Sequence, residues 1–235
     1  MVMINADDFG LNESCSRAIA EAFAKGLVTD TTMTANGEFF NGAVELAKRD
    51  GFFEKIGIHM NLTQGQPLTD EIKKLPDFVT DGRFNKRYNW NRELSPAERT
   101  AVYRELSAQF ERLEKAGIKI THADSHHYIH NAPYIAPIAE KVCMEHGVKR
   151  LRIMRNLGDM PEAERQKANE YRDGLRSRGF ITTDYFGRIS EAQDRELPGS
   201  VELLVHPDFD KDGNLIDRHG VEDGIPFGEK IKSPR

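Results

Sequence analysis

The chain has 235 residues, of which 38% are hydrophobic and 30% charged, and its formal net charge is −5 at pH 7. This length suits one barrel or doubly wound domain and allows a substantial hydrophobic core. The mild acidity argues against a nucleic-acid-binding protein that depends on bulk positive charge, and no apolar run is long enough for a transmembrane helix.

The first quarter of the chain predicts short strands that alternate with helices. Residues 2–5 form an apolar strand, and the start of the chain has neither the basic segment nor the long apolar run of a secretory signal. A helix with Asn12 as its N-cap follows and ends at Gly26. Next come a strand at 27–35, a short helix at 44–49 and a strand at 56–60.

Residues 62–94 have no strong periodicity and contain the only tryptophan, Trp90. An excursion of this length inside a compact domain is usually functional or disordered. We therefore expect a lid or substrate loop in this segment.

The rest of the chain returns to the alternating pattern. Ser95 and Glu98 have the form of a capping box, and an apolar stripe from Val102 to Leu113 predicts a helix that ends at Gly117. The further elements predicted are strands at 118–124, 148–154, 180–186 and 201–205 and helices at 133–147 and 161–178. About seven strands separated by helices indicate one α/β domain over 1–235, with a parallel sheet that is open or closed into a barrel.

Four polar clusters follow predicted strands at their carboxyl ends. They are Asp7 with Asp8, then His59, then residues 124–130, and finally His206. Active sites of parallel α/β folds lie at this edge of the sheet, so we expect the four clusters to form one site.

The adjacent carboxylates Asp7 and Asp8 repel each other, and a nearby cation would relieve that repulsion. One of them could bind a divalent metal while the other holds or deprotonates a metal-bound water. For an isolated pair, a polar strand end or a helix N-terminal anion is an equally good interpretation.

Histidines are the second unusual feature. His59 alone would more often be a structural hydrogen-bonding residue, but His126, His127 and His130 occur within five positions beside Asp124. They form either a solvated polar loop or imidazole ligands with a carboxylate partner. An aspartate with two histidines suits a catalytic divalent cation, without distinguishing zinc, magnesium, manganese and cobalt.

His206 ends an apolar run, either as a strand-end residue or as a general acid, since histidine titrates near neutral pH. No G-x-S-x-G, P-loop or G-x-G-x-x-G pattern occurs, which argues against serine-nucleophile and nucleotide chemistry. Cys15 and Cys143 have no metal-type spacing, and a reduced cytoplasmic location is expected.

At these residues the chain resembles the YdjC-like carbohydrate deacetylases, a family that includes chitooligosaccharide deacetylases. The resemblance runs in order from residue 2 to about 208. Its segments are INADDFG at 4–10, GLVTDTT at 26–32, GIHMNLT at 57–63, THADSHHYIH at 121–130 and ELLVHP at 202–207. It implies a distorted TIM-like (β/α) barrel with about seven parallel strands.

The resemblance also implies an activity, which is metal-dependent removal of an acetyl group from an N-acetylated mono- or oligosaccharide. One divalent ion, magnesium or zinc, would be held by Asp8, His59 and His126. Asp7 would be the general base, and His206 the acid or transition-state stabiliser.

Substrate contacts are expected from four further residues, Asp124, His130, Arg152 and Trp90. An ordinary salt bridge explains Arg152 equally well, and packing of the 62–94 loop explains Trp90. The chain departs from the family pattern at Tyr128, where a third histidine is common, and in its tail at 208–235.

Two other functions stay open. The first is another metal-dependent hydrolase or isomerase on a TIM-like barrel, acting on a phosphate ester or an aldose. The second is a non-catalytic sugar-binding or regulatory protein that retains the metal site. A homodimer is allowed, and neither nucleic acid nor a membrane is expected as a partner.

Overall fold

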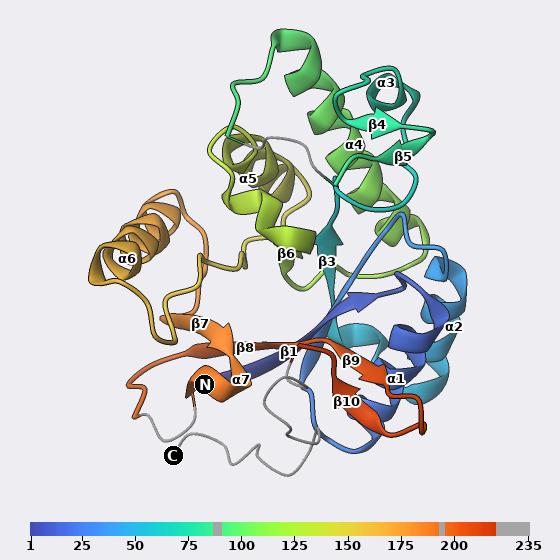
Figure 1. The fold of residues 1–235 in the computed structure, drawn as a ribbon, viewed down its shortest axis with the longest axis vertical. Helices are drawn as coiled ribbons and strands as arrows, with labels where there is room; N and C mark the ends of the chain where they lie inside the picture. The colour runs from blue at the N-terminus through green and yellow to red at the C-terminus, as the bar shows by residue number, and fades with distance from the viewer. Residues whose placement is uncertain (87–90, 193–195, 220–235) are drawn as a thin grey trace.

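A curled sheet of six parallel strands forms the centre of the fold, in the order β6-β3-β2-β1-β8-β7 (Figure 1). The computed structural model describes residues 1–86, 91–192 and 196–219. The six strands are β1 (Val2–Phe9), β2 (Asp30–Met33), β3 (Ile56–Met60), β6 (Ala123–Ser125), β7 (Tyr185–Arg188) and β8 (Val201–Val205). Their parallel, curled arrangement is that of a distorted TIM-like barrel, which confirms the predicted fold class.

Residues 150 and 151 connect the two edges of the sheet through isolated β-bridges. Ala123 at one edge pairs with Leu151, and Arg150 pairs with Ile181, just before the strand at the other edge. The strand predicted at 148–154 is therefore reduced to isolated bridges. The strand predicted at 118–124 is likewise short, because only its end, Ala123–Ser125, continues the ladder with β3.

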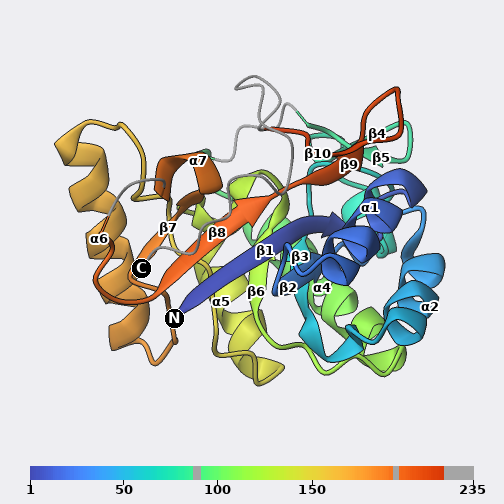
Figure 2. The same ribbon diagram turned by 90° about the horizontal axis from the view of Figure 1, so that it is seen from below.

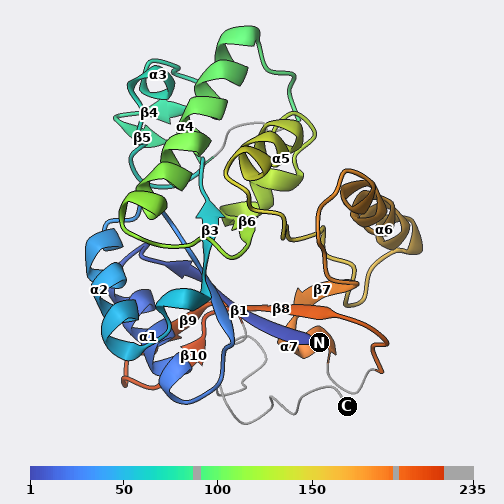
Figure 3. The ribbon, with the colours of Figure 1, turned by 180° about the vertical axis from the view of Figure 1, so that it is seen from behind.

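Helices cover the outside of the sheet. α1 and α2 pack together near β1, and α4 packs against α5 and β3 (Figures 1 and 3). Figure 2 shows α6 at the opposite side of the molecule from α1 and α2. The helices are α1 (Glu13–Ala24), α2 (Phe40–Asp50), α4 (Pro96–Lys115), α5 (Ala136–Glu145) and α6 (Glu162–Ser177). Fully buried side chains such as Ile19, Ile58 and Phe110 fill the layer that these elements enclose.

The local signals that predicted the helix starts are present in the structure. Asn12 accepts a hydrogen bond from the Cys15 amide at the start of α1. At the start of α4, Ser95 and Glu98 make both bonds of a capping box. α6 is a surface helix, as its polar sequence predicts, and buries only Ala168 and Leu175.

The segment predicted as a loop at 62–94 contains small elements of its own, namely α3 (Asp70–Lys73), β4 (Val79–Thr80) and β5 (Arg83–Phe84). It is tied to α4 by Glu105, a fully buried carboxylate that accepts the amide hydrogens of Leu68 and Thr69. Phe84 is buried in the hydrophobic core. Trp90 lies outside the described residues.

The C-terminal hairpin of β9 (Pro207–Phe209) and β10 (Leu215–Asp217) was not predicted, and it packs on α1. The remaining short elements are η1 (Phe53–Lys55), η2 (His126–Asn131) and α7 (Ile189–Ala192). Within the described ranges, no helix combines the length and the apolar character that crossing a membrane requires.

Candidate metal centre

Asp7 and Asp8 both face one pocket at the carboxyl end of β1. Consecutive residues of a regular strand point to opposite faces. Here Asp8 has a left-handed backbone with φ of 73°, and the pairing with β2 shifts register between Ala6 and Phe9. This irregularity directs both carboxylates to the same side, and such local strain is a common mark of a functional site.

Three side chains from three different strand ends converge beside this irregularity. Asp8 Oδ1 lies 2.9 Å from His126 Nδ1 and 3.3 Å from His59 Nε2. The three candidate ligand atoms lie within 4.8 Å of one another. All three side chains are buried, Asp8 and His59 almost completely.

The donor set fits a divalent metal ion. Asp8 Oδ1 and His59 Nε2 are buried and lack a hydrogen bond to any of the described residues, although they lie close together. Unpaired buried polar atoms are costly, and a cation between them would satisfy both. A carboxylate and two imidazoles form the kind of ligand set that catalytic metal sites use.

A hydrogen bond to Asp124 orients His59. His59 Nδ1 lies 2.7 Å from Asp124 Oδ1, so Nδ1 donates its proton there and Nε2 is directed at Asp8. Burial lowers the pKa of His59, but the charge and hydrogen bond of Asp124 outweigh it and raise that pKa to about 10. Surroundings that favour a positive charge on His59 also favour a bound cation.

His126 is oriented from the other side. Its Nε2 lies 3.0 Å from Gln64 Oε1, which leaves Nδ1 facing Asp8. The next two residues, His127 and Tyr128, have φ of 53° and 55°, so the chain turns sharply after His126 and does not continue as a regular helix. His127 then points to Thr63, whose Oγ1 is 2.9 Å from its Nδ1.

Asp7 is held by Arg152, a guanidinium that is almost fully buried. Arg152 Nη1 and Nη2 each lie 2.7 Å from one oxygen of Asp7. Burial alone would raise the pKa of Asp7, but the charge and hydrogen bonds of Arg152 hold it well below its ordinary value. Asp7 is therefore ionised across the physiological pH range.

Arg152 also binds two other buried carboxyl groups, at 2.7 Å to Asp124 and 2.5 Å to Glu202. Both aspartates of the alternative cluster of Asp7, His59 and Asp124 are therefore already paired with a protein cation, and we do not assign a metal to it. Asp8 is not bound by Arg152, so its carboxylate is the one that we assign to the metal.

Two residues from the end of the described chain complete the pocket. Arg218 Nη2 donates to Asp8 Oδ2 at 2.9 Å. His206 lines the same pocket, and burial lowers its pKa to about 4, so its imidazole is neutral at pH 7. The ring of His206 packs edge-on against that of His219, with centroids 4.2 Å apart.

The structure therefore brings together, around one cavity of about 370 Å³, the residues expected to carry the chemistry. They are Asp7, Asp8, His59, His126 and His206. Three residues expected to contact substrate lie beneath this cavity instead. Asp124, His130 and Arg152 are at most 2% exposed and bind other protein groups, so we assign them to positioning the site.

Gln64 and Arg218 also line the pocket but were not among the predicted site residues. Gln64 lies four residues beyond β3, so its place near the carboxyl edge of the sheet was a usable signal. Arg218 had none, because the hairpin that carries it back to Asp8 was not predicted.

Comparison with known proteins places this geometry in context. A family model described as "YdjC-like protein" matches residues 1–226. The crystal structure of a proposed cellobiose-phosphate cleavage protein from Enterococcus faecalis V583 is similar, with a TM-score of 0.71 and 23% identity over 90% of this chain and 82% of that one. A lactam utilization protein from Thermus thermophilus matches with a TM-score of 0.44 and 20% identity, over 80% of this chain and 66% of that one.

Proposed function

The chain belongs to the YdjC-like protein family, and from this premise we propose that it is a metal-dependent hydrolase that removes the acetyl group from N-acetylated sugars such as chitooligosaccharides. One observation carries the proposal. The ligand atoms of Asp8, His59 and His126 converge without hydrogen bonds to satisfy them all, directly beside the ionised Asp7.

Asp8, His59 and His126 would hold the ion. When bound, a divalent cation would polarise the acetamide carbonyl and lower the pKa of the attacking water. Two imidazole ligands favour zinc or another transition metal over magnesium, which prefers oxygen ligands.

Asp7 is proposed as the general base. Among the described residues, its Oδ1 accepts hydrogen bonds from Arg152 and Asn5, whereas its Oδ2 accepts only one, from Arg152. A carboxylate oxygen has capacity for a second hydrogen bond, so Oδ2 can accept the proton of the water that attacks the carbonyl carbon. Hydrolysis then breaks the C–N bond, and the proton passes from Asp7 to the leaving sugar amine.

His206 is proposed as the stabiliser of the developing oxyanion. Because burial keeps it neutral at pH 7, it starts with no extra proton to give, but one ring nitrogen carries a hydrogen that it can donate. The cationic side chains of Lys86 and Arg218 line the same cavity and favour negative charge there.

The test is acetate release from N,N′-diacetylchitobiose by purified protein, first after chelation and then after single divalent metals are added back. Release that requires a metal would support the proposal and identify the working cation. Phosphate and ketose release from suitable substrates, measured in parallel, would detect another hydrolase or an isomerase. Tight sugar binding without acetate release, on a metal-loaded sample, would favour the non-catalytic alternative.

A further inference from the structure

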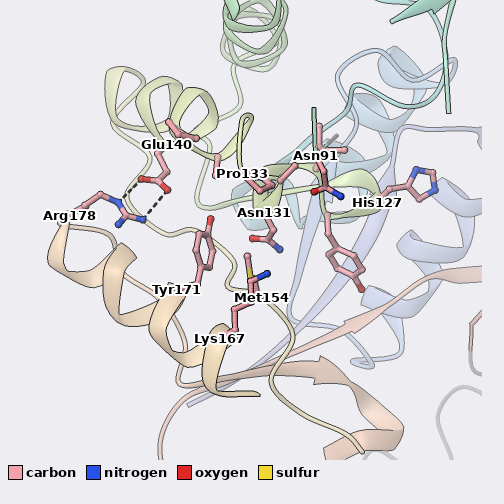
Figure 4. A pocket seen from close by; sticks show the side chains of 14 residues that line it. Asn91, His127, Asn131, Pro133, Glu140, Met154, Lys167, Tyr171 and Arg178 are labelled. Atoms are coloured by element: carbon pink, nitrogen blue, oxygen red, sulfur yellow. Dashed lines mark hydrogen bonds and ion pairs between the residues drawn. The ribbon is translucent and has the colours of Figure 1, made fainter. Parts of the chain in front are cut away.

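A second pocket of about 680 Å³ opens between α5 and α6, beside the metal site (Figure 4). Its volume lies within the range of about 300–1,000 Å³ that small-molecule sites occupy. Figure 4 shows Tyr171 and Lys167 of α6 directed toward Asn131 and Met154 on the facing wall. Nothing in the proposed deacetylation uses these four side chains.

The two pockets share a wall. His127 and Tyr128 line both the metal pocket and this second pocket. These are the two consecutive residues with left-handed φ, and a bulky residue in that conformation is uncommon. The backbone strain is thus located at the junction of the two cavities, and Tyr128 exposes 40% of its surface there. The two cavities are therefore neighbours that adjoin at His127 and Tyr128.

The lining of the second pocket suits a neutral, hydroxyl-rich ligand with apolar faces. The rings of Tyr128 and Tyr171, with Met154, provide apolar surface on which the C–H face of a sugar can rest. Asn131 adds an amide whose oxygen has no hydrogen-bond donor among the described residues. Such a group remains able to accept a hydrogen bond from a hydroxyl.

The charges of the pocket argue against a strongly anionic ligand. Arg178 is bound by Glu140 through two hydrogen bonds of 2.7 and 3.0 Å, so its charge is already balanced. Lys167 is exposed, and no ion pair links it to another described residue. A single ammonium group can hydrogen-bond to sugar hydroxyls, whereas phosphate sites usually combine several donors.

We propose that this pocket binds the neighbouring ring of an oligosaccharide whose N-acetylated ring lies in the metal pocket. The inference rests on the proposed function and adds a second subsite to it. Tyr128 forms the boundary between the two rings, and Tyr171, Lys167 and Asn131 contact the second ring.

The experiment compares a disaccharide with a monosaccharide. For wild type, Lys167→Ala and Tyr171→Ala, kcat/KM for acetate release is measured with N,N′-diacetylchitobiose and with N-acetylglucosamine. The ratio of the two values is expected to be about tenfold or more in favour of the disaccharide in the wild type, and to fall by about tenfold in each variant. Glu164→Ala, an exposed position on α6 outside the pocket, is the matched control and should leave the ratio unchanged.

Lys167 is exposed, so its replacement does not endanger folding even if Tyr171→Ala does. Acetate release with an unchanged ratio in Lys167→Ala and in folded Tyr171→Ala would overturn the second subsite and leave the deacetylase proposal intact. If the wild type releases no acetate, the deacetylase proposal fails, and N,N′-diacetylchitobiose is titrated calorimetrically into the same metal-loaded proteins. Binding that weakens about tenfold in the variants would retain the sugar pocket, whereas equal or absent binding would overturn it.

Discussion

Asp7 and Asp8 are adjacent in the chain but have different partners, and this difference separates their roles. Arg152 binds both oxygens of Asp7, whereas Asp8 contacts His59, His126 and Arg218. Burial alone would raise the pKa of Asp8, but its contacts with the two histidines lower it well below the ordinary value. Both carboxylates are thus ionised, and only Asp8 has an imidazole on either side to share a metal ion.

Replacing these two aspartates should therefore give different results. Asp7→Asn should retain bound metal but reduce kcat by about 10²–10⁴-fold, because the base is lost while the ligands remain. Asp8→Asn should lose both metal and activity. Metal content after dialysis and acetate release would be measured on the same samples, with circular dichroism as the folding control. Full turnover by Asp7→Asn would show that another group is the base.

Arg218 affects the metal ligand in two opposing ways. Its hydrogen bond to Asp8 Oδ2 fixes the carboxylate, while its positive charge repels a cation. The side chain is 41% exposed, so solvent screens its charge, and the orienting effect should dominate. Arg218→Gln should weaken metal binding by about tenfold, within the range known for residues that orient metal ligands. Tighter metal binding in a competition titration would mean that charge repulsion dominates instead.

Among the elements, α4 begins with a capping box that was predicted from the sequence and that stabilises the start of the helix. The Glu98 carboxylate accepts the amide hydrogen of Ser95 at 2.7 Å and pairs with Arg92. The Ser95 hydroxyl in turn accepts the Glu98 amide hydrogen at 3.3 Å. These contacts, chiefly the one with Arg92, lower the pKa of Glu98 from 4.5 to about 2. The charged form of Glu98 is therefore favoured in the folded state.

Because the pKa of Glu98 is lower in the folded state, the contribution of Glu98 to stability decreases as the pH falls. The stabilisation is fully present above the unfolded pKa of 4.5 and is lost as pH falls toward about 2. Glu98→Gln should lower the free energy of unfolding by about 1 kcal/mol at pH 7, and by much less near pH 2.5. Urea unfolding of wild type and variant at both pH values checks this, with Glu54→Gln, an exposed position without an ion pair among the described residues, as the control. An equal loss at both pH values would contradict the assignment.

In the molecule as a whole, the site gathers buried charged groups from elements that lie far apart in the sequence. Four buried carboxyl groups surround it, contributed by Asp7, Asp8, Asp124 and Glu202. Two guanidinium groups, from Arg152 and Arg218, are bound to them in the described part of the chain. The three candidate metal ligands, Asp8, His59 and His126, come together only in the folded chain, so metal binding and global stability should be coupled.

Adding the metal should raise the melting temperature. At a free metal concentration of about 100 times Kd, mass action adds about 2.7 kcal/mol, which corresponds to roughly 5–10 °C for a chain of this size. Differential scanning calorimetry with and without chelator would measure the shift. His59→Ala is the control, and its melting temperature should change very little when metal is added. A shift equal to that of the wild type would mean that the metal binds elsewhere.

The elements of the fold were largely predictable because their signals are local. The capping box of α4, the polar face of α6 and the strands Ile56–Met60 and Val201–Val205 follow from residues within a few positions of one another. The two shortened strands at 118–124 and 148–154 were not, because the distortion of the barrel decides how far each strand pairs.

The kind of site was predictable from the residue pattern, because carboxylates and histidines at the carboxyl ends of parallel strands are brought to one edge by the topology. The partners of these residues, in contrast, depend on long-range contacts in the folded chain. Arg152 reaches Asp7 across 145 positions, and Arg218 reaches Asp8 across 210. Contacts of that separation depend on how the barrel curls and where the C-terminal hairpin returns, and no local pattern records either. The second pocket likewise could not be predicted from a local pattern, because α5, α6 and the strained turn at Tyr128 form it jointly.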